Sequence, residues 1–138
     1  MVKKFLGVFL IFLMAAVANA QETISPTLLA KARENLARSE TTARRALTAL
    51  SDDLSHEEWT AASDEITRLV GEVQKNLDQA EQAVKRGEEE TARLSLKASV
   101  DPQMRLVGLT TALLFQVGEK TGRKLEELKE LLPKKEGI

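Results

Sequence analysis

Apolar residues recur every three or four positions along the chain after Ser25, which is the spacing of one face of an α-helix. No stretch shows the strict alternation of a β-strand, and no Asn-Gly or Asp-Gly pair offers a tight hairpin turn. The sequence therefore predicts an all-α protein. The prediction rests mainly on two stripes of apolar residues. They are Leu29, Ala32, Leu36, Ala43, Ala46 and Leu50 in the first segment, and Trp59, Ala62, Ile66, Leu69, Val73, Leu77, Ala80 and Val84 in the second.

Residue types that start and stop helices stand at the ends of these stripes. The Ser-Pro pair at 25–26 suits a helix start, because Ser caps free amide groups and Pro is tolerated in the first turn. We expect that helix to end near Ser51. Ser55 and Glu58 have the S-x-x-E spacing of a capping box at the start of the second helix. The Lys-Arg-Gly run at 85–87 suits the end of that helix.

The third segment begins with the acidic run at 88–90, which favours a helix N-terminus. Because the connection is so short, the second and third helices are expected to pack antiparallel. Pro102 then allows two outcomes. Either Asp101 caps a new helix that begins at the proline, or the proline kinks one continuous helix.

A short fourth helix is expected in "TGRKLEELKELLP", residues 121–133. Gly118 and Gly122 precede it, Leu125, Leu128 and Leu132 fall on one face, and the final proline would stop it. The expected architecture is an up-down bundle of three long helices plus this short C-terminal helix.

Residues 76–96, "NLDQAEQAVKRGEEETARLSL", resemble in their spacing the interhelical turns of periplasmic four-helix proteins such as the cytochrome b562 group. The resemblance implies a similar bundle. It implies no haem site, because that group binds haem through a Met near the start of the first helix and a His on the last. After residue 20 this chain has only Met104 and His56, so no cofactor is expected.

The first twenty residues have the form of a secretory signal peptide. Lys3 and Lys4 precede an apolar run that ends in an Ala-Asn-Ala cleavage motif at 18–20. We expect cleavage after Ala20, a single domain over residues 21–138, and a periplasmic or secreted protein. An uncleaved membrane anchor is the alternative reading. The chain has no cysteine, so a lipid-modified cysteine cannot attach it to a membrane.

Composition excludes several functional classes. Without Lys3 and Lys4 the net charge is about −3, and Trp59 and Phe115 are the remaining aromatic residues, so a nucleic-acid partner is not expected. Thiol catalysis and disulfides need cysteine. The single histidine, His56, has no recognisable catalytic companion, so we expect no enzymatic activity.

A metal site has only weak candidates. Asp52, Asp53 and His56 lie close together in the sequence and have the oxygen and imidazole ligands that divalent metals use. The other interpretation is structural: the two aspartates end the first helix, and the acidic residues beside His56 favour the start of the second. One histidine without a second ligand at a fixed spacing does not predict a metal.

The thirteen residues from Leu106 to Gly118 carry no charge, although charged residues make up 30% of the chain. They are too few for a second membrane span. Their apolar residues form two adjacent stripes, so this helix is either the most central one of the bundle or a surface for a protein partner or a second copy. The residues expected to form that surface are Leu106, Leu109, Leu113, Phe115 and Val117.

We therefore expect a secreted or periplasmic, non-enzymatic helical bundle that binds other proteins, with self-association through the third helix as one form of that binding. The alternative is a periplasmic carrier bundle for a small ligand or a metal.

Overall fold

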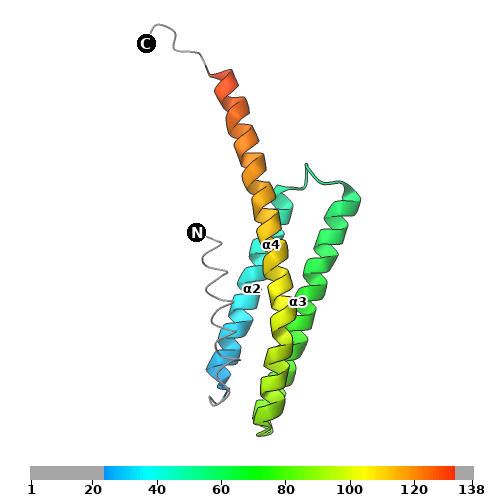
Figure 1. Cartoon of the computed structure of the whole chain (residues 1–138), viewed down its shortest axis with the longest axis vertical. Helices are drawn as coiled ribbons and strands as arrows, with labels where there is room; N and C mark the ends of the chain where they lie inside the picture. The colour runs from blue at the N-terminus through cyan, green and yellow to red at the C-terminus, as the bar shows by residue number, and fades with distance from the viewer. Residues whose placement is uncertain (1–23, 133–138) are drawn as a thin grey trace.

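The computed structural model of the chain describes residues 24–132, which form three long helices. These are α2 (Pro26–Ala49), α3 (His56–Lys85) and α4 (Glu89–Leu131), and they run up, down and up (Figure 1). Each helix packs against the other two, and the contact between α3 and α4 is the most extensive. The all-α bundle is confirmed. The expected signal peptide, its cleavage site after Ala20 and the expected stop at Pro133 lie outside the described residues.

The helix ends follow the capping chemistry of the sequence. The Ser25 hydroxyl accepts a hydrogen bond from the amide of Leu28, and α2 ends at Ala49, two residues before the predicted end. At the start of α3, Ser55 and Glu58 bond each other's backbone amides, which confirms the predicted capping box. These hydrogen bonds, first the one donated by the Ser55 backbone, lower the pKa of Glu58.

Gly87 closes α3 in the left-handed conformation, with φ of 75°. A Cβ atom is disfavoured in that conformation, whereas Gly71 inside α3 is helical and a Cβ there would meet no atom within 4 Å. We therefore expect Gly71→Ala to raise the free energy of unfolding by about 1 kcal/mol and Gly87→Ala to lower it by about 1 kcal/mol. Urea unfolding of both variants measures the two changes. Shifts of the same sign would contradict the assigned end of α3.

The core lies between the three helices and is made mostly of alanine and leucine. The predicted stripe of α2 is buried as expected, with Ala32 and Ala43 at 1% and 0% exposure, so a neighbouring helix can approach closely. In α3 the buried residues begin only at Ile66, and Trp59 remains 36% exposed. Trp59 was therefore wrongly predicted as a core residue. It lies in the first turn of α3, where the apolar spacing continues but little of the helix surface is buried.

Arginine side chains of α2 link it to α3. Arg33 lies 2.7 Å from carboxylate oxygens of both Asp78 and Glu81, and Arg44 donates to the hydroxyl of Thr67 at 2.9 Å. The pKa of Arg33 is raised, first by its hydrogen bond to Asp78. These contacts join residues that are far apart in sequence, and so they favour one alignment of the two antiparallel helices.

α4 is one continuous helix of 43 residues that passes through Pro102, Gly118 and Gly122. A proline inside a helix removes one backbone hydrogen bond and costs about 3 kcal/mol. Here Pro102 is itself buried, and the helix is packed into the core on both sides of it, at Leu96 and Leu106. Of the two outcomes that the sequence allowed, the described residues show the uninterrupted helix. The prediction of a separate fourth helix was wrong, because the described residues of that segment form the last turns of α4.

Candidate interaction surface

The end of α4 extends past the connection between α2 and α3 (Figure 1). Lys120 donates to the Ala49 carbonyl at 2.8 Å, and Arg123 donates to the Asp53 carboxylate at 3.0 Å, so these two residues mark where α4 leaves the bundle. From residue 121 to residue 132 every residue is exposed. We call residues 121–132 the α4 extension.

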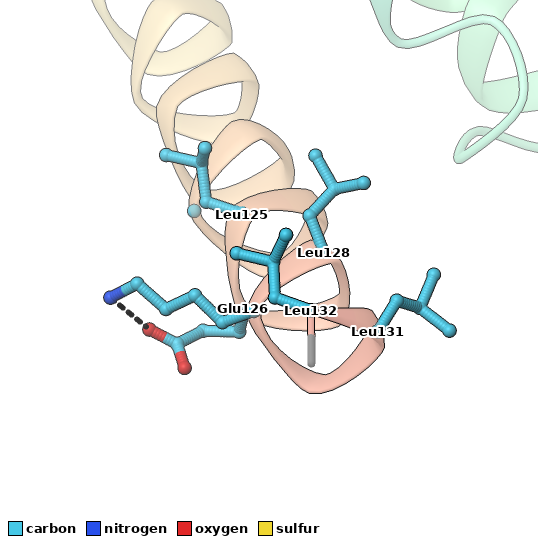
Figure 2. Close-up of a pocket in the computed structure, with 7 residues that line it drawn as sticks. Leu125, Glu126, Leu128, Leu131 and Leu132 are labelled. Carbon is cyan, nitrogen blue, oxygen red and sulfur yellow. Dashed lines mark ion pairs between the residues drawn. The ribbon is translucent and has the colours of Figure 1, made fainter. Parts of the chain in front are cut away.

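Leucines make one side of the α4 extension apolar. Leu125, Leu128 and Leu132 are 54%, 57% and 64% exposed and project to the same side of the helix, while Glu126 projects to another (Figure 2). They border an open hollow of about 550 Å³, which is lined by Gly122, Leu125, Glu126, Leu128, Lys129, Leu131 and Leu132. The apolar side of the α4 extension is therefore not covered by any other described part of the chain.

The same side of α4 is apolar further back along the helix. Counting from Leu132 towards the N-terminus in alternating steps of four and three gives ten positions, which we call the outer stripe: Val100, Met104, Val107, Thr111, Leu114, Gly118, Thr121, Leu125, Leu128 and Leu132. In the bundle region these residues are half-buried or exposed, and Met104 is 47% exposed. At 1.5 Å per residue the outer stripe is about 48 Å long. Seven of the ten are large apolar residues, and Thr111, Gly118 and Thr121 interrupt the row in its middle. Apolar residues at heptad spacing are typical of a coiled-coil contact.

The predicted interaction residues are divided between the core and the surface. Leu106 and Leu113 are 1% and 4% exposed and belong to the core, and Leu109 and Val117 are partly buried against it. Phe115 is 56% exposed. The first two therefore cannot contribute to a free surface while the bundle is folded. Exposed large apolar residues of the outer stripe are Met104, Leu125, Leu128 and Leu132, whereas Val100, Val107 and Leu114 of that stripe are half-buried. The sequence showed two apolar rows on this helix without indicating which row faced inward.

The weak metal candidates are not gathered into a ligand set. Asp53 is occupied by ion pairs with Arg123 and Lys120, and His56 is the exposed first residue of α3. Within residues 24–132 there is no group of three His, Asp, Glu or Cys side chains that could hold a metal ion. The carrier alternative thus has no such ligand set in this part of the chain.

Polar side chains occupy part of the core-facing side of α4. Ser99 and Thr110 are buried and donate to carbonyls of their own helix, at 2.6 Å and 2.7 Å. Gln103 is 7% exposed, and its buried Nε2 has no hydrogen-bond partner among the described residues. A buried donor without a partner keeps its desolvation cost.

Gln103→Met is therefore expected to raise the free energy of unfolding by about 1–2 kcal/mol, because methionine has a similar length and no donor to leave unpaired. Gln79→Met, at an exposed position of α3, serves as the control and should change stability by less than about 0.5 kcal/mol. Thermal and urea unfolding of the two variants measure this. A loss of stability in Gln103→Met would indicate that the amide is hydrogen-bonded in solution.

We compared the chain with known protein families, sequences and structures. No protein-family model, curated protein sequence or solved structure matches this chain. None of the helices between residues 24 and 132 has the length and apolar character needed to cross a membrane.

Proposed function

We propose that the protein is a non-enzymatic interaction module of the periplasm or the extracellular space, which binds an amphipathic helix of a protein partner along the outer stripe of α4. One observation carries this proposal: α4 continues beyond its own bundle with a row of leucines exposed. Large apolar side chains grouped on a surface often mark a binding site.

The spacing of the leucines supports a helical partner. Alternating steps of three and four give a narrow row that another helix can cover, and charged side chains such as Glu126 and Lys129 lie beside it. In proteins most of the stability of a helix comes from packing of its apolar face, and the apolar face of residues 121–132 is exposed. The α4 extension would be stabilised by a partner that buries its apolar side.

The three outer-stripe leucines of the α4 extension do not by themselves supply enough free energy for stable association. Full burial of a leucine side chain contributes about 1.5–3 kcal/mol, and Leu125, Leu128 and Leu132 each keep more than half of their surface exposed. Covering these three contributes roughly 3 kcal/mol, which is less than the cost of association. A partner must therefore also cover stripe residues in the bundle region.

Export is the second part of the proposal and rests on residues 1–20. Protein recovered from the medium or periplasm of the producing cells should begin at Gln21 when its N-terminus is sequenced. An intact Met1 on cell-associated protein would contradict cleavage.

The binding proposal is tested by a photo-crosslinking amino acid placed at residue 128 or at residue 126 of the full chain in the producing cells. Position 128 lies in the outer stripe, and position 126 lies on the same turn of α4 outside it. We expect a discrete protein adduct from position 128 that is absent from position 126 and is lost when Leu125→Asp is added. Equal labelling from both positions, or no adduct from either, would overturn the proposal.

A further inference from the structure

We infer that the partner of the outer stripe is a second copy of this chain, bound antiparallel to the first with the two-fold axis near Gln116. This inference rests on the proposed function and adds the identity and direction of the partner. The argument uses the sizes, the charges and the positions of the stripe residues.

The outer stripe is complementary to itself when it is reversed. In the antiparallel register, Leu114 faces the partner's Gly118, Thr111 faces the partner's Thr121, and Val107 faces the partner's Leu125. Further out, Met104 meets the partner's Leu128, and Val100 meets the partner's Leu132. Each large apolar residue thus faces either an apolar residue or the space above a glycine. In a parallel pair, Gly118 would face the partner's Gly118 and leave a gap, which close packing disfavours.

Charges beside the stripe favour the same direction. In the antiparallel register Asp101 comes level with the partner's Lys129, and the symmetry produces this pair twice. Both side chains are exposed, and their present ion pairs are made within α4, with Arg105 at 3.2 Å and with Glu126 at 3.7 Å. A parallel pair would instead place Lys124 beside the partner's Lys129, which is a repulsive contact between flanking positions.

The position of the α4 extension also fits a second copy. In this register residues 121–132 lie level with residues 100–111 of the other chain, the part of α4 that its own bundle supports. Each extension would therefore be covered where it leaves its own bundle, and the whole length of the stripe would be used. A contact made by the two extensions alone would leave Met104, which is 47% exposed, uncovered.

Cysteine pairing measures the direction directly, because the chain contains no cysteine of its own. We would prepare full-length Val107→Cys and Leu125→Cys and oxidise each alone and as an equal mixture. In the antiparallel pair, residue 107 of one copy is about 27 Å along the axis from the partner's residue 107, far beyond the roughly 4.4–6.8 Å between Cα atoms of a disulfide. Neither variant alone should form a dimer, and the mixture should form the 107-to-125 disulfide.

Charge reversal gives an independent readout. Asp101→Lys and Lys129→Asp should each weaken the dimer about fivefold to tenfold in sedimentation equilibrium, since both symmetric pairs become repulsive. The double variant carries both reversals in one chain and should return to within about twofold of the original affinity. Circular dichroism of each variant checks that the helices are retained.

Two results would overturn the inference. Disulfide formation by Val107→Cys alone would indicate a parallel pair. A chain that sediments as a monomer and forms no disulfide in any mixture would exclude a second copy. In that second case, a crosslink from position 128 to a different protein would still support the proposed function, and its absence would remove both.

Discussion

Leu113→Asp is expected to unfold the bundle, and Leu128→Asp is expected to leave it folded while abolishing association. Leu113 is 4% exposed in the core, whereas Leu128 is 57% exposed on the α4 extension. A carboxylate at residue 113 would lose its hydration without gaining a partner, which costs several kcal/mol, a large part of the stability of a small domain. At residue 128 the same group stays in water but interrupts the apolar row.

Circular dichroism and sedimentation separate the two variants. For Leu113→Asp we expect loss of the helical signal or a melting temperature lowered by more than 15 °C. For Leu128→Asp we expect an unchanged signal at 222 nm and a monomeric mass. The neighbouring change Glu126→Asp, outside the stripe, should alter neither quantity. A folded, stable Leu113→Asp protein would mean that α4 presents another face to the core.

Leu77→Ala is expected to lower the free energy of unfolding by about 3 kcal/mol. Leu77 is fully buried in α3, so its truncation removes apolar contacts and leaves a cavity between helices that can close only in part. Urea unfolding followed by circular dichroism measures the change, and the slope with denaturant should stay the same.

Leu94→Ala provides the matched control for that prediction. Leu94 lies on α4 and is 58% exposed, so the same truncation should cost less than about 0.5 kcal/mol. Equal losses from both variants would contradict the assignment of the core. They would also weaken the distinction between the core row and the outer stripe of α4, on which the binding proposal depends.

Local features of the sequence predicted most of the first two helices. The stripe of α2, its Ser25 cap, the capping box of Ser55 and Glu58 and the stop at Gly87 are all present in the structure. Each of them depends on residues within one or two turns of each other. Such interactions form in the same way wherever the segment lies in the protein.

The course of α4 could not be predicted in this way. Pro102, Gly118 and Gly122 each weaken a helix. A local interpretation placed a break near the two glycines and left either a break or a kink open at the proline. At Pro102 the helix continues because core packing on both sides of the proline offsets the lost hydrogen bond. The predicted burial of Trp59 was wrong for a related reason. Apolar periodicity indicates which residues share one face of a helix, but not whether another helix covers that face.

The sequence by itself determined the helical class, the caps and the turns of this protein, because these follow from contacts between near neighbours in the chain. Only the tertiary structure decided which of the two apolar rows of α4 faces inward and where that helix leaves the bundle. Burial depends on the side chains that distant segments bring to the same place. Leu113 and Leu128 have the same side chain on the same helix. Leu113 lies in the part of α4 that packs against α2 and α3 and is a core residue, whereas Leu128 lies beyond them and is a candidate contact.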